Sequence, residues 1–140
     1  MNGFLTVIEK GDHHAQARHH SFRFAASHRA LFPGDRAGNV VYTSGLLPFD
    51  KEGNLIGADN VRAQTRAVLE NIKSVLEAAG GSLSDVAVSM IFLRDLKDFQ
   101  AMNEVYGEYF KKDPPARWCI GCELVKPEFL VEIQCVAYVA

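Results

Sequence analysis

The sequence predicts an α/β sandwich, of the α+β kind, in which one β-sheet carries two helices on a single face. Three observations support this class. Residues 60–79 and 98–110 repeat apolar residues at helical spacing. Short β-branched or aromatic runs precede, separate and follow these segments, which gives the order β–α–β–α–β–β. The chain has 140 residues, so we expect one domain, residues 1–140, with its own hydrophobic core.

The first third of the chain is the hardest part to assign. Residues 4–9 alternate apolar and polar side chains and predict an edge strand. Residues 13–29 contain all five histidines, with His13-His14 and His19-His20 as two pairs. Histidines can bind metal, but these show no regular ligand spacing on a helix or strand. We therefore expect a solvated loop here and no metal site.

The pattern is clearer from residue 38 onward. Residues 39–45 (NVVYTSG) are β-branched and aromatic, which predicts a strand. Residues 50–54 predict a turn. Asp59 or Asn60 can cap a helix that runs to about Ala79 and that Gly80-Gly81 ends.

The second half continues with a strand, a helix and two strands. Residues 85–93 are apolar on both faces, as in a covered central strand. The helix 98–110 ends before Pro114-Pro115, and strands follow at 116–124 and 129–139. The expected buried stripe of this helix is Phe99, Met102, Tyr106, Tyr109 and Phe110. One sheet face would stay bare, so we predict an oligomer.

The overall charge argues against two classes of partner. The net charge is −2 and the pI about 6.2, so no general field attracts nucleic acid or an anionic membrane. No apolar run is long enough to span a bilayer. Residues 1–4 lack the basic and apolar parts of a secretory signal. We expect a cytoplasmic protein.

Three cysteines are too few, and odd in number, for a disulfide framework. Cys119 and Cys122 have C-x-x-C spacing, but the segment reads as extended chain and not as the start of a helix. No second C-x-x-C completes a zinc site. Buried strand thiols are the favoured interpretation.

Arg117 and Glu132 are charged residues inside otherwise apolar strands, where an unpaired charge is costly. If the last two strands form a simple hairpin, Glu132 lies opposite Gly121, on the face that also carries Cys119 and Arg117. The pair could flank a ligand or fix an oligomer interface. An arginine fork matches a carboxylate with two parallel hydrogen bonds, so a small-molecule carboxylate is the natural ligand. Dinucleotide, ATP and serine-hydrolase motifs are missing.

About three quarters of the chain, from Gly38 to its end, resembles the RidA/YjgF family, whereas residues 1–37 match poorly. The matching groups, in the family's order and spacing, are residues 38–45 (GNVVYTSG), 63–65 (AQT) with 69–72 (LENI), 98–99 (DF) with 103–106 (NEVY), and 115–117 (PAR) with 131–133 (VEI). Within the family, residues 115–122 (PARWCIGC) and 124–127 (LVKP) are most similar to the aminoacrylate deaminases of the Rut pyrimidine-degradation pathway.

The resemblance implies a chorismate-mutase-like fold with one mixed sheet, assembled as a homotrimer with sites in clefts between subunits. Members hydrolyse reactive enamines and imines to carbonyl acids and ammonia, without metal or organic cofactor. The resemblance implies that Arg117 grips the substrate carboxylate. Glu132 is the candidate for holding water and moving protons. Ser44, Asn103 and Cys119 match the other pocket positions.

The front end departs from the family, because Leu31 or Phe32 aligns where many relatives have a tyrosine. The substrate could therefore be a 3-aminoacrylate, a 2-aminoacrylate or a larger acid such as 2-aminomuconate. A regulatory trimer that binds a small molecule without turnover is an alternative that shares the arginine pocket. An RNA-acting protein is the weakest alternative, because no basic, aromatic stripe is present.

Overall fold

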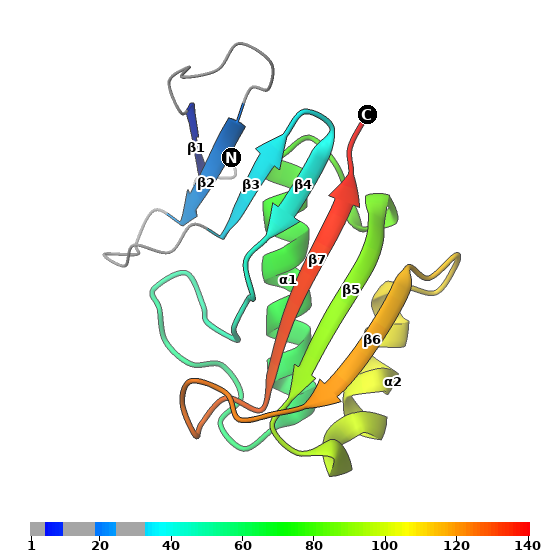
Figure 1. Cartoon of the computed structure of the whole chain (residues 1–140). Helices are drawn as coiled ribbons and strands as arrows, with labels where there is room; N and C mark the ends of the chain where they lie inside the picture. Colours follow the sequence, from blue (N-terminus) through cyan, green and yellow to red (C-terminus); the bar gives the residue numbers. More distant parts are fainter. Residues whose placement is uncertain (1–4, 10–18, 25–32) are drawn as a thin grey trace.

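The computed structural model describes residues 33–140 in full and the backbone of residues 5–9 and 19–24. In this part of the chain, seven strands form one sheet in the order β1-β2-β3-β4-β7-β5-β6 (Figure 1). Helices α1 (Val61–Ala78) and α2 (Phe99–Tyr109) cover one face of it. The strands are β1 (Leu5–Glu9), β2 (His19–Phe24), β3 (Gly34–Ala37), β4 (Val40–Thr43), β5 (Val86–Leu93), β6 (Ala116–Gly121) and β7 (Val131–Tyr138).

The N-terminal strands partly revise the sequence analysis. The predicted edge strand is confirmed, because β1 is the first strand of the sheet and pairs with β2 alone. The expectation of a loop was wrong for residues 19–24. These residues form β2, which pairs antiparallel with β1 on one side and β3 on the other. Pairing on both sides satisfies backbone groups that a loop would leave to water. The other residues of 13–29 lie outside the described part.

Helix α1 forms as predicted. Asn60 is the N-cap, and its side-chain oxygen accepts a hydrogen bond from the amide of Ala63 at 3.0 Å. Gly80 ends the helix with φ +84°, a left-handed conformation that glycine adopts without strain. The buried face of α1 packs on the sheet, and its members are Val61, Gln64, Thr65, Ala67, Val68, Leu69, Ile72, Val75 and Leu76.

Helix α2 buries a different stripe from the predicted one. Met102, Tyr106 and Phe110 are buried as expected. Val105 is also buried, whereas Phe99 is 41% exposed. Phe99 is the first residue of α2 and lies beside Arg117, outside the core.

The last two strands do not form the hairpin that we assumed. β6 pairs in parallel with β5, and β7 pairs antiparallel with β5 and β4, so β5 separates β6 from β7 (Figure 1). The reason is the helix α2, which carries the chain from β5 back to a parallel neighbour. The segment after β6 then passes to the free side of β5. The sheet is therefore mixed.

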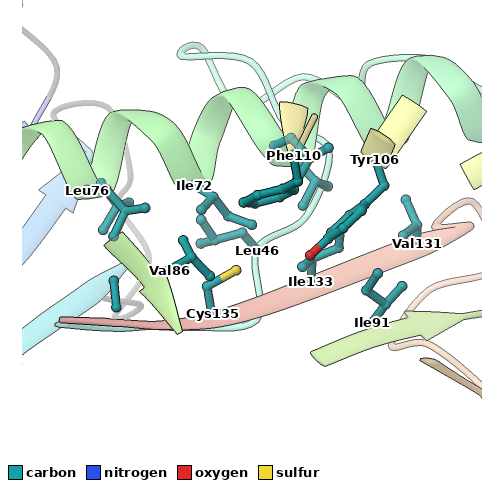
Figure 2. Packing of buried hydrophobic residues seen from close by; sticks show 14 of the residues in the cluster. Leu46, Ile72, Leu76, Val86, Ile91, Tyr106, Phe110, Val131, Ile133 and Cys135 are labelled. Atoms are coloured by element: carbon teal, nitrogen blue, oxygen red, sulfur yellow. The ribbon is translucent and has the colours of Figure 1, made fainter. Parts of the chain in front are cut away.

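The core lies between the helices and the covered sheet face (Figure 2). Alternate residues of β7 point into it, namely Val131, Ile133, Cys135 and Ala137. Side chains of α1 and α2, including Ile72 and Tyr106, meet them. No helix among the described residues has the length and apolar character needed to cross a bilayer.

Candidate active site

Arg117 projects from β6 on the helix-covered side of the sheet. Its strand partner is Ser89 of β5, which is fully buried on that side. The guanidinium carbon lies 4.8 Å from the ring centre of Tyr106 and 5.9 Å from that of Phe99, a cation–π arrangement. One nitrogen, Nη1, donates a hydrogen bond to Oδ1 of Asn103 at 2.6 Å.

The three neighbours of Arg117 form one stripe of α2. Phe99, Asn103 and Tyr106 are spaced by four and three residues, so they share a helix face. The resemblance implied that Asn103 and Arg117 belong to one pocket, and the structure brings the two together. Sequence reasoning assigned Phe99 and Tyr106 to the core and missed their contact with the guanidinium. Their spacing from Asn103 was the available signal.

Arg117 has a neutral hydrogen-bond partner. In the part of the chain that the structure describes, the ion pairs join Arg62 to Glu104, Arg66 to Glu108, Lys97 to Asp95 and Lys126 to Glu128, and none includes Arg117. Arg117 is also exposed. A guanidinium has five N–H donors, so most of its fork is available to an anion.

Cys119 lies two residues beyond Arg117 on the same side of β6, opposite Ile91 of β5. It is partly buried. Burial raises the pKa of the thiol, and the nearby charge of Arg117 opposes this effect. A thiol with a raised pKa is a poor nucleophile at neutral pH, so Cys119 suits pocket lining. Among the described residues, all three cysteines are free thiols, so Cys119 and Cys122 form no disulfide.

Glu132 lies on the other side of the sheet. It pairs with Phe92 of β5, which in turn pairs with Ile120 of β6, and this row faces away from the helices. Half-burial raises the pKa of the Glu132 carboxyl group. A carboxyl group with a raised pKa can exchange protons closer to neutral pH than an ordinary glutamate.

The backbone after β4 lies against the Glu132 carboxylate. A Cβ atom on Gly45 would lie 1.9 Å from Oε1 of Glu132, so the carboxylate keeps this position only beside a glycine. Leu46 and Ile133 exchange backbone hydrogen bonds of 2.8 and 3.2 Å, which fixes this approach. Ser44 immediately precedes Gly45 in the chain and is partly buried. Ser44, Gly45 and Glu132 therefore form one group.

The predicted site residues thus form two groups on opposite sides of one sheet. Arg117, Asn103 and Cys119 lie on the helix side, and Ser44 and Glu132 on the other. The expectation that Arg117 and Glu132 share a face was wrong, because it assumed a β6–β7 hairpin. With β5 between the two strands, the register puts them on different rows.

Two other features of the described residues lie apart from these groups. A shallow hollow of about 360 Å³ lies beside the start of α1, where Asn60, Arg62, Lys97 and Leu130 contribute to its lining. None of the predicted site residues lines it. No cluster of three or more histidine, cysteine or acidic residues suited to a metal ion occurs among the described residues.

The chain is similar to one protein-family model and to several solved structures. The family model described as Endoribonuclease L-PSP matches residues 26–139. RidA from an Antarctic Psychrobacter is 37% identical over 81% of this chain and 92% of its own, with a TM-score of 0.74. TdcF of Escherichia coli, solved with bound serine, is 30% identical over 82% and 92%, with a TM-score of 0.75. A YjgF/YER057c/UK114 family member from Mycobacterium tuberculosis is 30% identical over 78% and 86%, with a TM-score of 0.69.

Proposed function

The chain belongs to the Endoribonuclease L-PSP family, whose RidA/YjgF proteins are known for enamine and imine deaminase activity, and from this we propose that it is such a deaminase. Its substrate would be a small carboxylate-bearing enamine or imine, of the aminoacrylate kind found in the Rut pathway. The products would be a carbonyl acid and ammonia. The observation that carries the proposal is Arg117, an exposed guanidinium held by a neutral amide and two aromatic rings.

A carboxylate is the ligand that this arrangement fits best. Phe99 and Tyr106 bear no ionised group that would neutralise Arg117. Asn103 accepts only one of the guanidinium N–H groups of Arg117. Two parallel charge-assisted hydrogen bonds to a carboxylate would use the others. The serine held by TdcF is a small amino acid with such a carboxylate, which supports a ligand of this size.

The two groups of residues can act together only if copies of the chain associate. Arg117 on one copy and Glu132 on another would then line the same cleft. The uncovered sheet face supports association, because Tyr42, Trp118 and Ile120 expose about half of their surface there (48%, 51% and 47%). A closed homotrimer repeats one heterologous contact three times and would make three equal sites.

The chemistry then divides between the groups. The enamine takes a proton at carbon and becomes an iminium, which Arg117 holds by its carboxylate. Glu132 holds a water molecule and accepts its proton as the oxygen adds to the C=N carbon. The carbinolamine takes up a proton on nitrogen and loses ammonia, and its hydroxyl group gives up a proton to leave the carbonyl acid. Ser44 would add hydrogen bonds to the intermediates, and Cys119 would line the pocket.

The test is ammonia release from freshly generated enamine and imine acids of increasing size, compared with their uncharged amide analogues. We expect turnover of the small acids and little of the amides. Arg117→Ala should abolish it and keep the oligomer. The control is Arg66→Ala, which removes an arginine paired with Glu108 on the helix surface and should leave turnover unchanged. Full activity in Arg117→Ala would reject the proposal.

The same preparations separate the alternatives. A regulatory binding protein would bind the acids but release no ammonia beyond the uncatalysed rate. Turnover limited to the largest acids would favour a 2-aminomuconate-like substrate. The family description names an endoribonuclease, so an RNA substrate belongs in the panel. The net negative charge of the chain disfavours RNA as a substrate, so we prefer the small acids. Salt-sensitive RNA cleavage that is lost in Arg117→Ala would contradict this preference.

A further inference from the structure

A buried hydrogen bond ties the helix stripe beside Arg117 to the sheet below it. The hydroxyl of Tyr106 donates to Oγ of Ser89 at 2.9 Å, and both residues are almost fully buried, at 4% and 0% exposure. Ser89 stands in the centre of the row that joins Arg117 on β6 to Cys135 on β7. Its Oγ also lies 3.4 Å from the sulfur of Cys135.

The Tyr106 ring is held at several points. Its hydroxyl is on Ser89, its ring centre lies 4.6 Å from that of Phe110, and the guanidinium of Arg117 lies over it at 4.8 Å. Burial raises the pKa of the Tyr106 hydroxyl, so this group stays protonated and remains a donor. The ring is therefore a fixed platform under the guanidinium.

Asn103 holds the other side of the guanidinium. Arginine only donates hydrogen bonds, so the Asn103 amide must turn its oxygen toward Arg117 and its NH₂ group away. Arg117 therefore meets the Tyr106 ring, the more distant Phe99 ring and one acceptor, all on α2. Free in solution, an arginine side chain samples many rotamers, and this freedom is lost when it grips a ligand.

We propose that Tyr106 and Ser89 are positioning residues that fix the Arg117 guanidinium in its carboxylate-binding orientation before substrate arrives. The inference rests on the proposed function, in which Arg117 binds the substrate carboxylate. Arg117 holds that carboxylate throughout the reaction, so a partial loss of its positioning weakens substrate binding, whereas removal of Arg117 leaves the substrate without its main binding group. Loss of positioning should then raise KM and leave kcat nearly constant.

The test uses three single-atom changes. Tyr106→Phe removes the donor of the hydrogen bond and keeps the aromatic ring. Ser89→Ala removes the acceptor and keeps the strand β5 intact. Tyr109→Phe is the matched control, because it removes a tyrosine hydroxyl from the same helix that donates instead to Glu70 of α1 at 2.7 Å. Two quantities are measured in each oligomeric protein: the nitrogen-15 order parameter of the Arg117 Nε–H group, and KM and kcat for ammonia release.

We expect a lower order parameter and a KM raised roughly 3–10-fold in Tyr106→Phe and in Ser89→Ala, with kcat within about twofold. The double variant should match the single variants, because both remove the same bond. Tyr109→Phe should behave as wild type. An unchanged Arg117 order parameter in both variants, or a loss confined to kcat, would overturn the proposal. If the wild-type protein releases no ammonia, the deaminase assignment is refuted. A lower Arg117 order parameter in the two variants would still support the positioning role in that case.

Discussion

Arg117 and Glu132 project from opposite faces of the same sheet. Arg117 shares its row with Ser89 and Cys135 on the helix side, whereas Glu132 shares its row with Phe92 and Ile120 on the uncovered side. Because neighbouring residues of a strand alternate between faces, no rotamer brings the two charges into one pocket of a single chain. A reaction that needs both groups needs two copies of the chain.

The contact between Gly45 and Glu132 gives a first prediction. Gly45→Ala would place a Cβ atom 1.9 Å from Oε1 and 2.9 Å from Cδ of Glu132, so the carboxylate must move. The obstacle is the end of a flexible side chain, so the fold should survive. We expect ammonia release to fall by about 10- to 100-fold, in line with a misplaced proton-transfer group. Steady-state kinetics of the folded variant measure this.

Gly107→Ala is the matched control. Gly107 lies within α2, and a Cβ atom there would meet nothing within 4 Å. Alanine should stabilise the helix by roughly 0.5–1 kcal/mol and leave turnover unchanged. Wild-type activity in Gly45→Ala, with Gly107→Ala behaving as expected, would show that the Glu132 position does not matter.

The raised pKa of Glu132 predicts how stability depends on pH. Because burial disfavours the charged form, the folded protein binds this proton more tightly than the unfolded chain does. The resulting stabilisation is complete below the pKa of an unfolded glutamate, about 4.3, and is lost as pH rises through the folded pKa. Glu132→Gln cannot titrate. The free energy of unfolding of Glu132→Gln minus that of wild type should therefore increase from acidic toward neutral pH. Urea titrations at one protein concentration measure this difference.

Glu108→Gln should show the opposite trend. The hydrogen bond and charge of Arg66 lower the pKa of the exposed Glu108 carboxyl group. Its contribution to stability is present at neutral pH and is lost as pH falls through the folded pKa. The variant should be slightly less stable than wild type near pH 7 and equal to it at low pH. Parallel curves for Glu132→Gln and Glu108→Gln would contradict the assignment of a raised pKa to Glu132.

Gln64 of α1 connects the helix to the segment that leads into β7. Its amide donates to the carbonyls of Gly57 and Glu128 at 3.2 and 2.8 Å, and its oxygen accepts from the amide of Leu130 at 2.8 Å. Gln64→Leu would leave these partly buried groups unpaired, so we expect a loss of about 2–4 kcal/mol in the free energy of unfolding. Gln100→Ala, an exposed change on α2, should cost almost nothing. A loss below about 0.5 kcal/mol in Gln64→Leu would mean that water replaces the amide.

Local signals in the sequence were enough to predict the positions of the helices. Asn60 before an apolar stripe and Gly80 after it defined α1 to within a residue or so, because capping and left-handed backbone depend on nearby residues. The strand predicted at residues 129–139 likewise forms, as β7. The neighbours Asn103 and Arg117 came from the family resemblance and not from spacing.

The pairing of the strands could not be predicted from local signals in the sequence. The hairpin between residues 116–124 and 129–139 was the simplest choice, and nothing in either segment states that β5 lies between them. The error carried over to the site, because it put Arg117 and Glu132 on one face. β2 was missed for a similar reason, since its pairing depends on β1 and β3 and not on a strong pattern of its own.

The most direct test mixes two inactive proteins. Arg117→Ala lacks the carboxylate grip and Glu132→Gln lacks the proton-transfer group, so each alone should release no ammonia. In oligomers assembled from equal amounts of both, about one cleft in four would combine an intact Arg117 with an intact Glu132 from the next copy. We expect about a quarter of wild-type activity in the whole preparation, in which mass spectrometry confirms that mixed oligomers have formed. Mixed oligomers with no activity would contradict a site shared between copies.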